Sequence, residues 1–126
     1  MITLESARQY YPGSDAVHGF DHIERVYAMC QRIGTAEGAD MEIVLTAALL
    51  HDMEGSHPEA NRAEHHFDSA LEAERVLRGE GWSQPRIGEV THCIRAHRYR
   101  DDREPPHTLE AKVVFDSDKL DVLGAV

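Results

Sequence analysis

The sequence predicts a single all-α domain, and three observations lead to that prediction. The chain has 126 residues, 41% hydrophobic and 29% charged, which suits one domain with a buried core and leaves no room for two. Apolar residues recur three and four positions apart in most segments. Glycine and proline separate these segments at intervals that suit short helices rather than strands. We therefore expect residues 1–126 to form one domain of about five to six helices, without repeats or linkers.

The first two long helices are predicted on either side of a glycine. A helix over residues 21–37 carries one apolar stripe and can end at Gly38. Asp40 can cap a second helix, which runs to the adjacent His51 and Asp52. The apolar positions are Ile23, Val26, Cys30 and Ile33 in the first helix and Ile43, Val44, Ala47 and Ala48 in the second.

Two further helices are predicted in the middle of the chain. The first begins near Pro58, a residue favoured in the first helical turn, and ends near Arg78 because two glycines follow closely. Ser83 is placed to cap the second, whose apolar face continues to His97 and the basic stretch after it.

The last helix is predicted after a proline-containing loop. Residues 101–107 include the adjacent Pro105 and Pro106, which cannot lie inside a helix. Thr108 can then cap a helix over residues 109–123, whose apolar character is interrupted by three aspartates.

Charge and composition exclude several classes of function. Aspartate and glutamate number 23 against 13 lysines and arginines, and the formal net charge of -10 argues against general binding to nucleic acids or anionic membranes. No apolar run approaches the roughly 20 residues of a membrane span, and the first residues lack the plan of a secretory signal. We therefore expect a cytoplasmic protein in which Cys30 and Cys93 are reduced, buried thiols.

Histidine and aspartate side chains interrupt the predicted apolar stripes. His22, His51, Asp52 and Asp118 lie on three separate predicted helices, each next to apolar residues one turn away. Burying an ionised carboxylate is costly unless an opposite charge compensates it. A divalent cation is the simplest partner for all four groups. The alternatives are hydrogen-bonded core histidines and, for Asp118, a carboxylate on a helix surface.

The predicted ligand set indicates the kind of metal and the kind of chemistry. Two imidazoles and two carboxylates suit Mn²⁺, Fe²⁺, Co²⁺ or Zn²⁺ better than Mg²⁺ or Ca²⁺, although Mg²⁺ stays an option. Four protein ligands leave open positions on a six-coordinate ion. Water bound there would lose a proton near neutral pH, and substrate oxygens would be polarised by the same ion. These properties suit hydrolysis.

Several segments of the sequence resemble the HD-domain superfamily of metal-dependent phosphohydrolases. That family is marked by a histidine, a later adjacent His-Asp pair and a final aspartate on separate helices. The resemblance runs from about residue 15 to the end of the chain and implies a compact helical bundle with His22, His51, Asp52 and Asp118 as metal ligands. The matching segments are His18-Gly-Phe-Asp-His22 with Arg25-Val26, Glu37-Gly-Ala-Asp40, Ala47-Ala-Leu-Leu-His51-Asp52 and Asp116-Ser-Asp118-Lys-Leu-Asp121.

The final aspartate ligand has two alternatives nearby. Asp116 and Asp121 flank Asp118, and a helix turns by about 100° per residue, so Asp116 and Asp118 point in different directions. Asp118 shares its face with apolar residues, whereas Asp116 is nearer two lysines. We therefore expect Asp118 to be the ligand and Asp116 to be a solvated or ion-paired carboxylate.

Charged residues near the predicted ligands are candidates for catalysis and substrate binding. Asp52 and Glu54 are candidate general bases, and Lys119 and Arg25 are candidates to neutralise charge on a phosphate, although each cation can equally form a salt bridge. Guanidinium groups match phosphate oxygens in paired hydrogen bonds, so a basic patch is expected to contact substrate. The substrate-binding candidates are His97, Arg98, Arg100 and His66. The arginines can instead stabilise a helix C-terminus, and the two histidines are the better candidates for a second metal ion.

The function predicted from these residues and the resemblance is hydrolysis of a phosphoester or phosphoanhydride. The expected substrate is a nucleotide or a related small phosphate. Two rival hypotheses are a di-iron oxygenase of the same family, which needs a second metal, and a metal-stabilised regulatory module without turnover. Relatives usually continue with further helices beyond the position of Val126, so the resemblance implies a short member, a truncated chain, or a chain that depends on a partner subunit to cover apolar surface, and we expect self-association.

Overall fold

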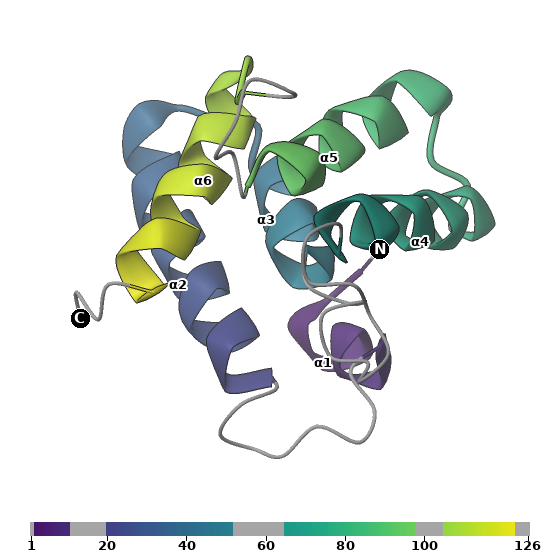
Figure 1. The fold of residues 1–126 in the computed structure, drawn as a ribbon, viewed down its shortest axis with the longest axis horizontal. Coiled ribbons are helices and arrows are strands. Elements are labelled where there is room, and N and C mark those ends of the chain that lie inside the picture. The colour runs from purple at the N-terminus through teal and green to yellow at the C-terminus, as the bar shows by residue number, and fades with distance from the viewer. Residues whose placement is uncertain (1, 11–19, 52–64, 98–104, 123–126) are drawn as a thin grey trace.

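The protein is all-α in the parts of the chain that the computed structural model describes, residues 2–10, 20–51, 65–97 and 105–122. Within these ranges there are six α-helices, one short 3₁₀ helix and no strand, which confirms the predicted fold class (Figure 1). None of the described helices is both long and apolar enough to span a membrane. The elements are α1 (Leu4–Ala7), η1 (Arg8–Tyr10), α2 (Phe20–Glu37), α3 (Met41–Leu50), α4 (His65–Gly79), α5 (Gln84–Ala96) and α6 (Leu109–Val122).

Helix α3 is the central element of the bundle. It contacts all five of the other α-helices, and seven of its ten residues are buried. Helices α2 and α6 pack side by side on one side of it, and α4 and α5 pack together on the other (Figure 1). Because α3 is apolar on nearly every face, its C-terminal end delivers His51 into the interior of the molecule.

Local capping chemistry fixes most of the helix boundaries. Asp40 accepts a hydrogen bond from the backbone N–H of Ile43 (3.4 Å) and begins α3, and the Thr108 hydroxyl accepts one from Ala111 (3.0 Å) and begins α6. Gly38 has a φ of 77° and closes the end of α2, because a left-handed conformation suits glycine best. The predicted positions of these boundaries are confirmed.

The boundaries predicted between α4 and α5 are confirmed in position and differ in one detail. Ser83 is the N-terminal cap of α5, but its side chain makes no capping hydrogen bond, and Pro85 in the first turn has no N–H that needs an acceptor. Gly79 is the last residue of α4, and Gly81, with a φ of 85°, closes the turn that follows, where the N–H of Trp82 donates to the carbonyl of Leu77. The predicted start near Pro58 lies outside the described residues.

The N-terminal helix was not predicted from apolar spacing, because four residues are too few for a periodic pattern. Its local signal is a capping box: the hydroxyl of Thr3 accepts from the N–H of Ser6 (3.0 Å), and the hydroxyl of Ser6 accepts from the N–H of Thr3 (2.9 Å). The helix buries Ala7 in the common core and packs against α3.

Both cysteines lie in the core as free thiols. Cys30 on α2 and Cys93 on α5 are fully buried, in agreement with the prediction. Burial raises the pKa of Cys30 to about 12 and also raises the pKa of Cys93. These thiols therefore act as small apolar groups in the core.

Candidate metal centre

The position of His51 follows from the end of helix α3. His51 is the C-terminal cap of that helix and is completely buried. Its Nδ1 lies 2.7 Å from the backbone carbonyl oxygen of Ala48. A carbonyl can only accept, so Nδ1 carries the proton and donates it, and Nε2 keeps a lone pair. This bond also uses one of the carbonyls that a helix end leaves without an internal partner.

The second imidazole comes from α2, near its N-terminal end. The Nε2 atom of His22 lies 3.0 Å from Oδ1 of Asp118, and its Nδ1 lies 2.6 Å from Oδ2 of Asp121. His22 is only partly buried. The two ring nitrogens of His22 thus face two carboxylates that lie one turn apart on α6.

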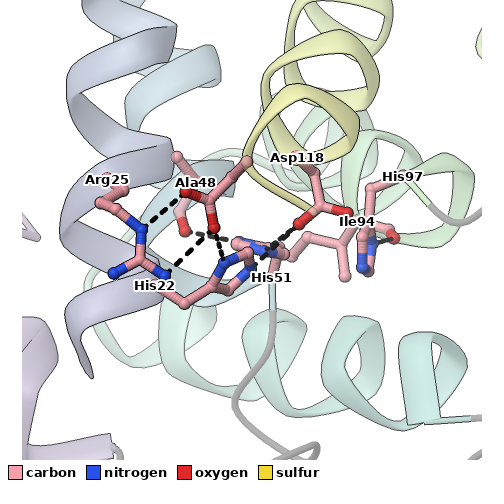
Figure 2. Close-up of polar contacts among 8 residues, drawn as sticks. His22, Arg25, Ala48, His51, Ile94, His97 and Asp118 are labelled. Atoms are coloured by element: carbon pink, nitrogen blue, oxygen red, sulfur yellow. Dashed lines mark hydrogen bonds and ion pairs between the residues drawn. The ribbon is translucent and has the colours of Figure 1, made fainter. Parts of the chain in front are cut away.

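Asp118 joins the two histidines. Its Oδ1 is 3.0 Å from Nε2 of His22 and 3.3 Å from Nε2 of His51, so the side chains from α2, the end of α3 and α6 point toward one another (Figure 2). Burial raises the pKa of Asp118, whereas imidazole N–H groups that donate to it, or a positive charge beside its Oδ1, lower that pKa. A positive charge at this position therefore keeps the carboxylate ionised at neutral pH.

The arrangement leaves a lone pair of His51 facing a negative oxygen. In the described part of the chain, the buried Nε2 of His51 has no hydrogen-bond donor beside it. A buried polar atom without a partner is costly, and two acceptors 3.3 Å apart repel each other. A cation would satisfy both groups. The ligand atoms of His22, His51 and Asp118 lie within 4.8 Å of one another, so one ion can reach all three.

The three candidate aspartates on α6 have different surroundings. Asp116 is exposed, as expected from its lysine neighbours, and Asp118 lies at the histidines. Asp121 binds the outer nitrogen of His22 and forms an ion pair with Arg25. Burial opposes ionisation of Asp121, but Arg25 and His22 outweigh it and lower its pKa. Asp121 is therefore a partner of the cluster rather than a fourth member of it.

The predicted cationic residues occupy different positions. The Nε atom of Arg25 donates to Oδ1 of Asp121 (2.6 Å), so its charge is already paired. Lys119 is exposed, and its ammonium lies over the ring of Phe115, 5.6 Å from the centroid. Of the two roles predicted for Arg25, phosphate neutralisation and a salt bridge, the structure shows the salt bridge.

His97 is the predicted substrate-binding residue that lies beside the cluster. It caps the C-terminal end of α5, is almost completely buried, and its Nδ1 donates to the carbonyl of Ile94. Its ring lies edge-on to that of His51, with centroids 4.8 Å apart (Figure 2). His51 and His97 thus use the same device, a hydrogen bond to the carbonyl three residues earlier.

The remaining predicted site residues lie outside the described part of the chain. His66 belongs to α4, but its side chain is not among those described. The others are Asp52, Glu54, Arg98 and Arg100. Their predicted roles stay predictions.

Comparison with known proteins identifies the family. Residues 19–123 match the family model of the HD domain. The chain is 34% identical over 113 residues to the uncharacterized protein YpgQ of Bacillus subtilis (strain 168), in a match that covers 86% of this chain and 53% of that protein. The chain thus spans about half the length of this curated relative.

Solved structures agree with this match. A predicted HD superfamily hydrolase from an uncultured Thermotogales bacterium superposes with a TM-score of 0.80 at 29% identity, covering 94% of this chain and 66% of the other. Bacillus subtilis YpgQ in complex with ADP gives a TM-score of 0.68 at 29% identity, covering 95% and 60%. The histidines and the aspartate that converge here occupy the positions that the sequence resemblance assigns to the family's ligands. The chain belongs to the HD-domain family.

Proposed function

We propose that this domain is a metal-dependent phosphohydrolase that acts on a nucleotide or a related small phosphate. The observation that carries the proposal is the convergence of His22, His51 and Asp118, in which a buried imidazole lone pair faces an ionised carboxylate. Asp52, which follows His51 directly in the sequence, is the proposed fourth ligand. The mixed nitrogen and oxygen donors favour Mn²⁺, Fe²⁺, Co²⁺ or Zn²⁺, with Mg²⁺ as a further option.

The protein residues hold the reacting groups, and the ion supplies the chemistry. A bound divalent ion lowers the pKa of water toward neutrality and polarises a phosphate oxygen. The hydrogen bonds from His51 to Ala48 and from His22 to Asp121 keep both Nε2 lone pairs directed at Asp118. His97, whose ring packs against His51, is the proposed substrate contact among the residues that the structure describes. Arg98, Arg100 and His66 are further candidates.

The charge distribution supports an anionic substrate only if a cation is present. The chain has a formal net charge of -10, and Arg25 is already neutralised by Asp121. The positive potential that attracts a phosphate therefore has to come from the metal ion and from cationic side chains near the site. The complex of the YpgQ relative with ADP supports a nucleotide as the class of ligand.

The test is metal-dependent release of phosphate or nucleotide products. The metal-stripped protein is refilled with Mn²⁺ and assayed against nucleoside triphosphates, diphosphates and phosphodiesters. We expect turnover of at least one class, and loss of about 10²-fold or more in His51→Ala and Asp118→Asn, because each removes part of the ion's coordination.

The matched control is Asp116→Asn, which makes the same change on the same helix at an exposed position. It should keep normal turnover. Activity that survives chelation, or that is equally reduced in the control, would contradict the proposal. No metal-dependent turnover of any substrate would favour the regulatory module, and two tightly bound iron ions per chain would favour the oxygenase.

A further inference from the structure

We propose that Asp121 and Arg25 are positioning residues that fix the tautomer of His22, so that Nε2 presents a lone pair to the metal ion. This inference rests on the proposed function, since it assigns these residues a part in building the same site. Neither residue belongs to the group of three that converges on the ion. Both act through His22 rather than on substrate.

The contacts form a chain that runs from the surface to the cluster. Arg25 lies one turn after His22 on α2, and Asp121 lies one turn after Asp118 on α6, so each pair shares a helix face. Nε of Arg25 is 2.6 Å from Oδ1 of Asp121, and Nη2 is 3.3 Å from Oδ2. The Asp121 side chain is only 7% exposed, whereas Arg25 is 49% exposed.

The chemistry of a carboxylate decides which nitrogen of His22 carries the proton. An ionised carboxylate has only acceptor atoms, so the 2.6 Å contact between Oδ2 of Asp121 and Nδ1 of His22 requires a proton on Nδ1. The other nitrogen, 3.0 Å from Asp118, is therefore the one that is available to a metal ion, which replaces the proton that Asp118 would otherwise hold there. Carboxylates that orient metal-binding histidines in this way also raise the basicity of the ligand.

The two histidines of the cluster reach the same state by different means. His51 is fixed by the backbone carbonyl of Ala48, which no substitution removes. His22 is fixed by a side chain, which can be replaced. Arg25 holds the Asp121 carboxylate through the short bond to Oδ1 and a longer one to Oδ2, and it balances the charge, so the orientation of this carboxylate depends on Arg25.

The replacement Asp121→Asn gives the sharpest test, because Arg25 determines how the amide is oriented. Nε of Arg25 needs an acceptor at the Oδ1 position, so the amide oxygen is expected there and the NH₂ group next to Nδ1 of His22. That NH₂ group donates to Nδ1 and moves the ring proton to Nε2. The ring then donates to Asp118 and cannot bind a metal ion.

The expected results differ from those of a structural role. Asp121→Asn should bind Mn²⁺ about 10- to 100-fold more weakly than the wild type, and at least as weakly as Asp121→Ala. Adding Arg25→Ala to Asp121→Asn frees the amide to turn, so the double variant should bind Mn²⁺ more tightly than Asp121→Asn alone. If Asp121 and Arg25 only stabilised the fold, both orders of affinity would be reversed. The isosteric Asp121→Asn would then bind Mn²⁺ more tightly than Asp121→Ala, and the double variant would bind it more weakly than Asp121→Asn alone.

Two measurements decide between these outcomes. Long-range ¹⁵N–¹H NMR of the metal-free protein should show a proton on Nδ1 of His22 in the wild type, and Nδ1 without a proton in Asp121→Asn, where only Nε2 carries one. Calorimetric titration with Mn²⁺ gives the affinities, with Asp116→Asn as the control and circular dichroism to verify folding. An unchanged tautomer and affinity in Asp121→Asn, or a double variant weaker than the single one, would overturn the inference. Wild-type protein that does not bind Mn²⁺ contradicts the proposed function instead, and the NMR comparison still judges the inference.

Discussion

At the scale of single residues, each imidazole of the cluster is useful because one nitrogen is committed to another bond. Nδ1 of His51 donates to a carbonyl and Nδ1 of His22 to a carboxylate, so both inner nitrogens are left as acceptors. Three acceptor groups then meet where no described donor lies beside Nε2 of His51. A site of this kind is stable only with a positive charge at its centre.

Sequence reasoning at this scale identified the members of the cluster but not the role of Asp121. Histidine or aspartate inside an apolar stripe predicts a buried polar group, and three such groups came together. The contact between Asp121 and His22 depends on how α2 packs against α6, across 99 residues of sequence. The three-residue spacing between Asp118 and Asp121 was the one available signal, since it places both on a single helix face.

The buried cysteines should be unreactive in the folded protein. The pKa of Cys30 is raised to about 12 by burial, so almost none of this thiol is ionised at pH 8, and the side chain is closed to solvent. We expect no alkylation of Cys30 or Cys93 by iodoacetamide at pH 8 until the protein is unfolded in guanidinium, as followed by mass spectrometry. Rapid modification of the folded protein would show that the core around these cysteines opens.

At the scale of elements, the sequence predicted the long helices well and missed the short N-terminal one. Helices α2, α3 and α6 have an apolar stripe and a recognisable start or stop, and their observed bounds lie within about two residues of those expected. Helix α1 has only four residues and is held by packing on α3. Ser83 shows that a good capping residue does not need to make the capping bond when proline follows.

The cap of α3 is predicted to contribute to stability in a pH-dependent way. Burial opposes ionisation of Asp40, but hydrogen bonds from Arg86 and from the N–H of Ile43 outweigh it and lower its pKa. The carboxylate therefore ionises more readily in the folded chain than in the unfolded chain. Its contribution is complete above the unfolded pKa of about 3.9 and is lost as the pH falls below that value.

Urea unfolding checks the cap. Asp40→Ala should lower the free energy of unfolding by about 1 kcal/mol at pH 7, and Asp40→Asn should lower it less, since asparagine also caps. The difference between the wild type and Asp40→Ala should shrink as the pH is lowered from about 6 toward 3. A difference that grows on acidification would mean that the carboxylate is not the stabilising form.

At the scale of the whole molecule, one apolar helix organises both the core and the site. Helix α3 contacts every other described α-helix and carries His51 at its end, while α2 and α6 bring His22 and Asp118 to the same point. The three ligands come from different helices and meet only in the folded chain. Binding of the ion therefore adds to the free energy of folding. The expected self-association of the chain stays a prediction.

The metal ion should therefore stabilise the entire bundle. An ion that binds only the folded state adds about 2.7 kcal/mol at a concentration 100 times its Kd. We expect Mn²⁺ to raise the melting temperature of the wild type, EDTA to reverse the rise, and His51→Ala to show neither effect. Differential scanning calorimetry measures this, and an equal rise in the wild type and His51→Ala would indicate binding elsewhere on the acidic surface.

The most direct test of the account is a crystal structure of the Mn²⁺-loaded protein with anomalous diffraction at the manganese edge. If the three side chains share one ion, an anomalous peak will lie roughly 2.0–2.3 Å from Nε2 of His22, Nε2 of His51 and a carboxylate oxygen of Asp118. A fully loaded crystal whose peaks all lie away from these three side chains would contradict it.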